Sequence, residues 1–373
     1  MKQPLLSIVI PTKDRYYYLQ ILLSKLITYN KNEIEIVIQD NTDDNSEFLD
    51  FLKGIDYSLL KYEYVKGQIP IYQNADKAIL NSTGKYICFI GDDDGVTSRI
   101  LDCVEYMDEK GIDVLLPKKV RYRWPDRHLS KIIDNAATME VEGASGKIVE
   151  MDTSRTIEEV LNIGCVHMGK LPQPYHGIVR REYYERIYNK CGTHFPGASP
   201  DIASAIALAL LNPVYVYAEL PVVIAGASKH HNGGAHKMKS NASEIEKIPF
   251  LPPNAAKEWD RRIPKIWTGE TIWCESAVKS LIRMGRNDLV EKVNFEYLYA
   301  KFITYHYPLR QMAWNLSDKK LVLICRIISM TVSRCVNISK RLLFRKKKGL
   351  YHGVSNIAEA IDIIESNYEI KLK

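Results

Sequence analysis

The feature that most constrains the fold is a regular alternation of short β-branched runs and helical patterns over the first 120 residues. The β-branched runs predict strands at 6–10, 33–39, 59–65, 85–90 and 113–117. Apolar residues recur at helical spacing between them, and the first helix is expected to begin near Asp14, whose side chain can cap it. This alternation predicts an α/β fold with a Rossmann-like, mostly parallel central sheet and flanking helices.

The pattern is less regular further along the chain. Residues 121–151 fit either a hairpin insertion or a loop, and later strands near 214–217 and 222–225 are expected to close the sheet. From 255 onward the pattern is mainly helical, after a proline-bearing stretch at 249–253. The expected division is a domain at 1–250, with halves 1–120 and 121–250, and a helical C-terminal extension at 251–373.

Composition sets the broad class. With 46% hydrophobic and 26% charged residues, the chain has the make-up of an ordinary soluble globular protein. Its formal net charge is +6, and much of the excess lies in 340–348. No nucleic-acid-binding motif accompanies that cluster, so no nucleic-acid partner is expected. Seven cysteines without a CxxC pair and a start without a secretory leader predict a cytoplasmic protein.

Three consecutive aspartates, Asp92, Asp93 and Asp94, follow the fourth expected strand and precede Gly95. In open α/β sheets, ligands bind at the carboxyl ends of the strands. Like charges this close disfavour full ionisation, and a divalent cation with oxygen ligands would relieve the repulsion. A solvated turn is the alternative, and the cluster alone does not decide between the two.

The surrounding motifs do bear on that choice. The segments SIVIPTKDR at 7–15, EIVIQDN at 35–41, Asn74, and TGKYICFIGDDD at 83–94 resemble the successive motifs of family 2 glycosyltransferases of GT-A fold. Those are inverting enzymes, and the likeness is to the bacterial polysaccharide type. Each motif is weak by itself, whereas their joint order and spacing over about the first 120 residues are specific.

The resemblance implies a donor site for a nucleotide sugar. Pro11, Thr12 and Arg15 would lie along the nucleotide, and Asp40 would accept hydrogen bonds from the base. An imide or amide N–H suits a carboxylate, which favours uracil without excluding guanine. Asp40 could instead serve as a turn or cap residue, and Arg15 as a solvated charge. Asn74 would also belong to the donor site, but Gln73 stands where the family often has an arginine.

The same resemblance implies a divalent cofactor, Mn²⁺ or Mg²⁺, held within Asp92–Asp94. Gly91 stands where the family commonly has the first aspartate of its motif, so the two carboxylates that would meet the metal are left open, and Asp92 and Asp93 are also expected beside the diphosphate. His231, in the glycine-bearing loop 230–234, is a further candidate ligand, with an exposed loop histidine as the alternative.

Inverting transfer requires a general base for the acceptor hydroxyl. The family places an acid at a helix start roughly a hundred residues after the metal motif, where this chain has Asp201. The alternative is an acid stabilised by the helix dipole, which would lower its pKa and weaken it as a base. His176, before Gly177, is expected either on the acceptor side or packed in the core.

The C-terminal run 321–348 mixes apolar with basic residues and contains no long uncharged apolar segment. It predicts either peripheral membrane contact, at the inner face of the cell membrane, or a helix packed on its own domain.

These observations together predict a metal-dependent inverting glycosyltransferase that moves a sugar from a nucleoside diphosphate donor to a hydroxyl of a glycan or lipid-linked glycan. Two alternatives come from other classes. A nucleotidyltransferase also uses acidic sites, although 11–15 has no glycine-rich phosphate loop. A non-catalytic sugar- or lipid-binding protein with a degenerate transferase fold would explain Gly91 and Gln73.

Overall fold

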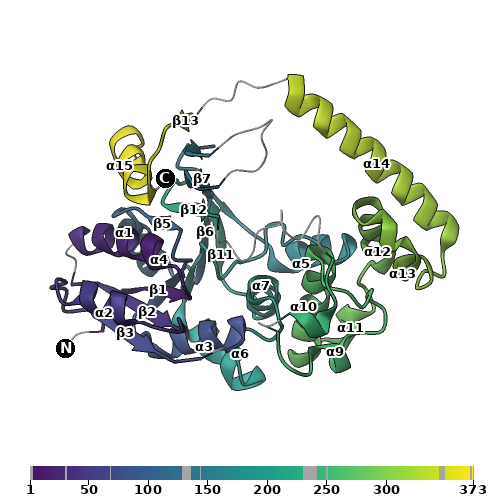
Figure 1. Ribbon diagram of the computed structural model, residues 1–373, viewed down its shortest axis with the longest axis horizontal. Helices are drawn as coiled ribbons and strands as arrows, with labels where there is room; N and C mark the ends of the chain where they lie inside the picture. The colour runs from purple at the N-terminus through teal and green to yellow at the C-terminus, as the bar shows by residue number, and fades with distance from the viewer. Residues whose placement is uncertain are drawn as a thin grey trace.

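The computed structural model describes residues 3–29, 32–67, 69–127, 136–142, 144–229, 242–248, 251–343, 349–369 and 372. Within them, a layered α/β part holds the N-terminal half of the chain, and a group of helices from the later sequence lies beside it (Figure 1). The predicted α/β class with a central sheet and flanking helices is confirmed.

The central sheet has eight strands in the order β3-β2-β1-β4-β10-β6-β11-β9. They are β1 (Leu6–Thr12), β2 (Ile34–Asp40), β3 (Leu60–Tyr64), β4 (Tyr86–Phe89), β6 (Val114–Pro117), β9 (Ile148–Glu150), β10 (Ile178–Arg180) and β11 (Tyr215–Ala218). The pairs β1 with β2, β2 with β3, β1 with β4, and β6 with β11 are parallel. β10 runs antiparallel to both of its neighbours, and β9 is antiparallel to β11. The sheet is therefore mostly parallel, as predicted.

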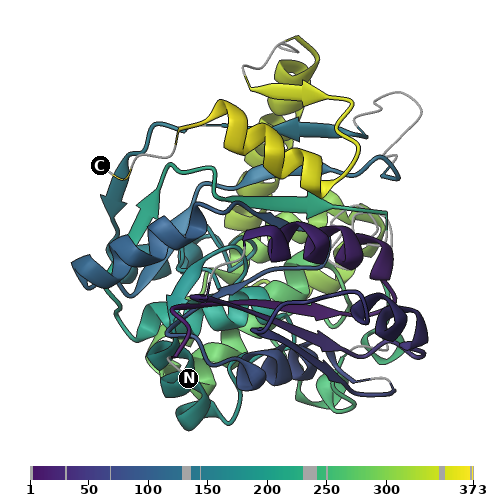
Figure 2. The same cartoon turned by 90° about the vertical axis from the view of Figure 1, so that its left-hand side faces the viewer.

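Both faces of this sheet are covered, which explains why its strands read as almost continuous apolar runs. In β1, Ile8 and Ile10 point into one hydrophobic cluster and Val9 into another on the opposite face. The helices that contribute residues to the first cluster include α1 (Tyr16–Leu26), α2 (Ser46–Leu52) and α4 (Ile100–Lys110). Those that contribute to the second include α3 (Ile71–Asn81), α6 (Arg181–Cys191) and α7 (Pro200–Leu210). Figure 2 shows helices on both sides of the sheet.

A second sheet has the order β13-β8-β7-β12-β5. Its strands are β5 (Gly95–Val96), β7 (Val120–Arg123), β8 (Thr138–Glu140), β12 (Val223–Ala227) and β13 (Leu350–His352). The expectation that 222–225 closes the central sheet is wrong, because β12 pairs with β7 and β5 instead. Within 121–151, β7 and β8 pair antiparallel, which agrees with the hairpin alternative.

The C-terminal residues return to the N-terminal core. β13 pairs with β8, and α15 (Ile357–Asn367) packs Ile357 and Ile361 into the same cluster as β1. A Cβ on Gly95 would lie 2.8 Å from Ile357 Cγ1, so this glycine allows the close approach of α15. The expected region 251–373 is therefore not one helical block, and its division from 1–250 stays a proposal.

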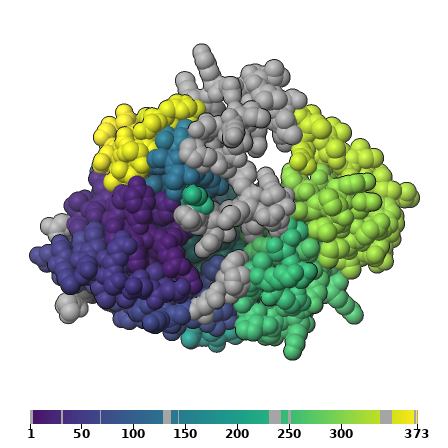
Figure 3. All heavy atoms as spheres, viewed as in Figure 1, coloured from purple at the N-terminus to yellow at the C-terminus, as the bar shows by residue number. Residues whose placement is uncertain are grey.

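The remaining helices pack with α7 into a lobe, most of which is the green to yellow-green side of the molecule in Figure 3. They are α5 (Thr153–Asn162), α9 (Ala255–Glu258), α10 (Gly269–Arg283), α11 (Asn287–Val290), α12 (Phe295–Tyr305), α13 (Arg310–Trp314) and α14 (Lys320–Leu343). Short 3-10 turns lie at Ile27–Tyr29, Ile245–Lys247 and Tyr307–Leu309. Ser280 Oγ donates to Ala203 O at 2.7 Å, which fixes α10 against α7.

α14 has two different faces. Leu323 is buried against the lobe, whereas Leu321, Ile328 and Val332 are 81%, 59% and 57% exposed. The alternative of a helix packed on its own domain thus describes one face, and membrane contact by the exposed face stays a prediction. No helix in the described part of the chain combines the length and the apolar character needed to cross a bilayer.

Candidate functional site

The site lies where β1 and β4 end. Their parallel register, and that of β1 with β2, brings Thr12 level with Asp40 and places the residues after Phe89 beside the end of β1. Thr12 Oγ1 donates to Asp92 Oδ2 at 2.7 Å. Because neighbouring parallel strands end at one edge, the triple aspartate meets the turn that leads into α1.

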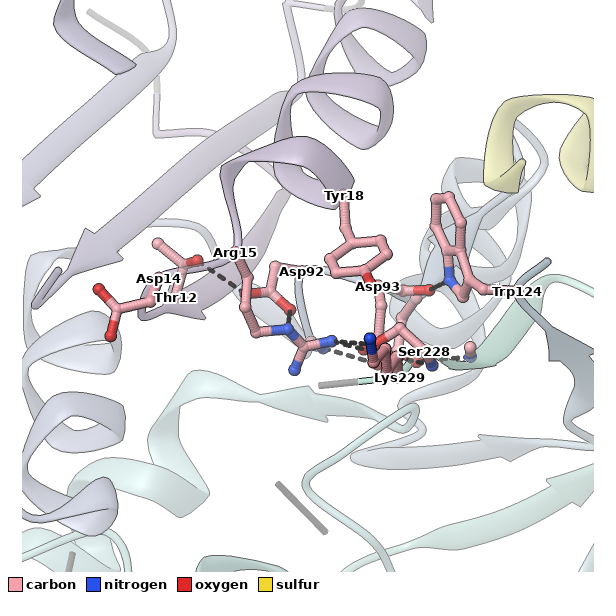
Figure 4. Close-up of polar contacts among 12 residues, drawn as sticks. Thr12, Asp14, Arg15, Tyr18, Asp92, Asp93, Trp124, Ser228 and Lys229 are labelled. Carbon is pink, nitrogen blue, oxygen red and sulfur yellow. Dashed lines mark hydrogen bonds and ion pairs between the residues drawn. The ribbon is translucent and has the colours of Figure 1, made fainter. Parts of the chain in front are cut away.

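Arg15 joins two of the aspartates. Its Nε lies 3.1 Å from Asp92 Oδ1 and its Nη2 lies 2.7 Å from Asp93 Oδ2 (Figure 4). Burial by itself would lower the pKa of Arg15, but the charges of Asp92 and Asp93 outweigh it and raise that pKa. Burial also raises the pKa of Asp92 to about 7, despite the opposing effect of Arg15. Arg15 is therefore not the solvated charge that the sequence left open.

The second sheet holds the other side of the cluster. Ser228 donates to Asp93 Oδ2 from its backbone N at 3.0 Å and from its Oγ at 2.8 Å. Gly226 N donates to Asp94 Oδ1 at 2.7 Å, and Trp124 Nε1 donates to the Asp93 carbonyl at 2.9 Å (Figure 4). Sequence reasoning missed these three residues. Gly226 was the one available signal, because a glycine inside a β-branched strand often marks a place where another backbone approaches closely.

Asp94 is bound on its other side by His176. Asp94 Oδ2 accepts from Gly91 N at 2.6 Å and lies 2.8 Å from His176 Nε2. His176 has a φ of 66°, an uncommon conformation for a residue other than glycine. Its buried Nδ1 has no hydrogen-bond partner among the described residues. The structure thus places His176 in the site and not simply in the core.

The carboxylates as arranged do not make a metal site. Both oxygens of Asp92 and both oxygens of Asp94 already contact protein donors, and Arg15 supplies positive charge between Asp92 and Asp93. Nowhere in the described residues do three or more His, Cys, Asp or Glu side chains gather to hold a metal ion. His231 lies outside the described residues.

Asp40 is fully buried and already has three donors. Its Oδ2 accepts from Tyr16 Oη at 2.6 Å and Tyr62 Oη at 2.8 Å, and its Oδ1 accepts from Thr42 N at 2.8 Å. Because Asp40 is fully buried, a nucleobase could reach this carboxylate only if neighbouring groups moved. The contact to Thr42 N is of the turn type that the sequence offered as an alternative.

Asn74 lies in α3 beside the ends of β1 and β2. Its Nδ2 is 3.4 Å from Thr12 O and 3.5 Å from Gln39 O, and its buried Oδ1 has no described partner. Pro11, one residue earlier in β1, is partly buried. Both therefore belong to the same strand edge as Arg15.

Asp201 lies in the first turn of α7. Its charge and that of Asp94 both act on Lys119 and Tyr175. Burial, with the charges of Asp201 and Asp94, raises the pKa of Tyr175 well above its ordinary value. Two carboxylates that are distant in sequence therefore share the same neighbours.

The segment that builds this strand edge matches a known family. Residues 7–170 match the model described as glycosyl transferase family 2. The chain is a glycosyltransferase with a family 2 domain. The match contains Arg15, Asp40 and the triple aspartate, whereas Asp201 and β12 lie beyond it.

Solved structures resemble the chain over most of its length. TarS 1–349 from S. aureus matches at 16% sequence identity over 89% of this chain and 91% of that one, with a TM-score of 0.44. The complex of TarS 1–349 with UDP-GlcNAc matches at 16% identity over 89% and 92%, with a TM-score of 0.45. No curated protein sequence matches the chain.

Proposed function

We propose that this glycosyltransferase uses a nucleoside diphosphate sugar, UDP-linked by preference, and transfers the sugar with inversion to a hydroxyl of a glycan or lipid-linked glycan. The observation that carries the proposal is that Arg15, Asp92 and Asp93 form one ion-pair cluster at the strand edge, within the segment that matches the family. The electrostatic effect of Asp201, in the first turn of α7, on Lys119 and Tyr175, which Asp94 also influences, supports Asp201 as the candidate base.

In the proposed reaction, Asp201 accepts the proton of the acceptor hydroxyl as its oxygen attacks the anomeric carbon. Attack comes from the face opposite the leaving nucleotide, so the configuration inverts. Positive charge near the leaving diphosphate would stabilise the charge that develops there. Arg15 can supply it, because its guanidinium lies at the strand edge and forms charge-assisted bonds that suit phosphate oxygens equally well.

The donor base is the first part to test. Stabilisation by a ligand in large excess follows its affinity, at about 2.7 kcal/mol for a concentration of 100 Kd. A thermal-shift series with UDP, GDP and several sugar nucleotides should show the largest shift for uridine nucleotides. Larger shifts with guanosine nucleotides would contradict the uracil preference. The absence of any shift would contradict a nucleotide-sugar donor.

The base assignment has its own test. Replacing a general base costs roughly 10²- to 10⁴-fold in rate. Asp201→Asn should therefore lose transfer to this extent while its affinity for UDP stays unchanged. Product analysis separates the alternative chemistry, since release of pyrophosphate in place of a nucleoside diphosphate would indicate a nucleotidyltransferase.

Metal dependence is a separate proposal. For Mn²⁺ or Mg²⁺ to bind Asp92 or Asp93, Arg15 must leave these carboxylates, and phosphate oxygens of the donor would have to supply further ligands. Titrations of UDP with manganese and with EDTA measure this directly. Equal affinity for UDP in both would contradict metal-dependent donor binding.

We also propose that the exposed face of α14 rests on an anionic membrane surface at the cytoplasmic side. Leu321, Ile328 and Val332 are exposed along it, and the sequence 340–348 that overlaps the end of α14 is rich in lysine and arginine. Apolar burial combined with attraction to anionic headgroups is the physical basis of such binding.

Vesicle sedimentation tests the membrane contact. Binding to phosphatidylcholine vesicles that contain phosphatidylglycerol should exceed binding to phosphatidylcholine alone, and should weaken in Ile328→Glu and at high salt. Equal, negligible binding to both vesicle types would contradict it. A dimer that Ile328→Glu dissociates, seen by light scattering, would assign the face to a second copy of the chain.

A further inference from the structure

Lys119 occupies a position that the proposed mechanism does not use. It lies in the short link between β6, which ends at Pro117, and β7, which begins at Val120. β6 is parallel to β11 and, through β10, runs in the direction of β4. Lys119 therefore follows the carboxyl end of a strand at the same edge as the triple aspartate.

The ammonium of Lys119 has one hydrogen bond to the protein and is partly exposed. Its Nζ donates to Gln173 Oε1 at 2.6 Å, and Gln173 is itself buried. Among the described residues this is its one hydrogen bond, and it forms no ion pair there. An ammonium has three donors, so two are available for another acceptor. Burial lowers the pKa of Lys119, while the charges of Asp201 and Asp94 act in the opposite direction.

The hydrogen bond to Gln173 connects Lys119 to the segment that holds the triple aspartate. Gln173 lies three residues before His176, whose Nε2 is 2.8 Å from Asp94 Oδ2. Lys119 is partly exposed, so water can reach its ammonium, and a ligand that displaces this water must supply the acceptors that it loses. The arrangement fits a side chain that completes its hydrogen bonds with a ligand.

The position of Lys119 indicates which part of the ligand it would meet. In an inverting displacement, the anomeric carbon lies between the leaving diphosphate and the acceptor oxygen with its base. On the proposed assignment, Asp94 lies on the donor side and Asp201 on the acceptor side. A side chain influenced by both is therefore beside the sugar ring, not beside the base of the nucleotide.

We infer that Lys119 binds oxygen atoms of the transferred sugar and thereby contributes to the choice of donor sugar. The inference rests on the proposed function, because it assumes a nucleotide-sugar donor and Asp201 as the base. Gln173 is the positioning residue, since its Oε1 holds the ammonium and its Nε2 lies 3.4 Å from Gly169 O. The remaining N–H groups would donate to hydroxyl or carboxylate oxygens of the ring.

The test compares binding of UDP with binding of UDP-glucose, UDP-N-acetylglucosamine and UDP-glucuronic acid by calorimetry. In the wild-type protein, the sugar nucleotide that is the donor should bind more tightly than UDP. Lys119→Met should reduce that advantage by about tenfold to a hundredfold, the usual effect of losing a hydrogen bond to a charged group. Affinity for UDP itself should stay within about twofold. Lys119→Arg should retain part of the advantage.

A stability measurement distinguishes binding from a structural role. Lys119→Met should leave the thermal midpoint equal or higher, because it removes an incompletely bonded ammonium. Exposed Lys110→Met, at the end of α4, is the matched control and should change neither binding nor stability.

Three outcomes would overturn the inference. They are an equal loss of affinity for UDP and its sugar conjugate, no loss for either, or a clear loss of stability in Lys119→Met. A wild-type protein that binds none of these nucleotides would instead refute the proposed donor, and the inference with it.

Discussion

Arg15 and Asp93 form an ion pair that Ser228 closes into a triangle. Arg15 Nη2 lies 2.7 Å from Asp93 Oδ2 and 2.8 Å from Ser228 Oγ, and Ser228 Oγ lies 2.8 Å from the same Asp93 oxygen. These residues come from the turn before α1, the loop after β4 and the end of β12. The contact therefore fastens the second sheet to the strand edge that carries the site.

Removing Arg15 should destabilise the fold. In Arg15→Met, Asp92 and Asp93 would remain buried without the cation that neutralises them. Breaking a buried pair from one side typically costs about 3 to 5 kcal/mol. Urea unfolding at neutral pH should show a loss of this size, with a smaller loss in Arg15→Lys, which keeps the charge but not the forked geometry. Unchanged unfolding of Arg15→Met would mean that the ion pair is not formed in solution.

Gly226 should not tolerate a side chain. A Cβ at this position would lie 1.7 Å from the Asp93 carbonyl oxygen, so Gly226→Ala must push β12 away from the aspartates. We expect a loss on the order of 3 kcal/mol or more, together with weaker nucleotide binding. Gly269→Ala is the control, because nothing lies within 4 Å of a Cβ there. Similar unfolding midpoints for the two variants would contradict the close approach.

Much of the N-terminal half could be predicted from the sequence. The buried strands are apolar on both faces, and helices lie between them as the apolar spacing predicts. The expected cap at Asp14 was wrong. Arg15 is the residue before α1, no side chain caps the helix, and Asp14 has a φ of 56° with its N–H bonded to Thr42 Oγ1. A loop contact thus determined the local geometry.

The second sheet could not be predicted, because its strands are short and their partners are distant in sequence. β13 and β8 pair across more than two hundred residues, and β12 meets only two residues of β5. The residues of the site differ in the same way in how far they could be predicted. Thr12, Arg15 and Asp92 were predicted together from local motifs, whereas Ser228 and His176 reach the aspartates through tertiary contacts that leave no local pattern.

Glu275 should make stability depend on pH. It is buried in α10, which raises its pKa to about 7 from an ordinary value of 4.5. Between these values the folded protein keeps a proton that the unfolded chain has lost, so the free energy of unfolding falls as pH rises. At about 1.4 kcal/mol per pKa unit, the loss approaches about 3 kcal/mol by pH 7 and then levels off.

The matched substitution is Glu275→Gln, which cannot ionise. Relative to the wild type, it should unfold at a similar urea concentration at pH 4.5 and at a clearly higher one at pH 8. Exposed Glu109→Gln serves as the control and should follow the wild type throughout. If Glu275→Gln and Glu109→Gln showed the same dependence on pH, the glutamate would not be buried as described.

The two tyrosines on Asp40 should each stabilise the fold. Phenylalanine at position 16 can keep the stacking on Phe48, whose ring centroid is 5.0 Å away, so Tyr16→Phe removes little except the hydroxyl. The buried carboxylate of Asp40 would lose one of its donors, and hydrogen bonds to charged groups are worth about 1.5 to 3 kcal/mol. Urea unfolding should show a loss of that size in Tyr16→Phe and in Tyr62→Phe.

In the double variant, Asp40 Oδ2 would lose both of the tyrosine hydroxyls that it accepts from, so the loss should be at least additive. A double variant as stable as the wild type would show that Asp40 is accessible to water or ligand, and would favour its role as the acceptor of a nucleobase.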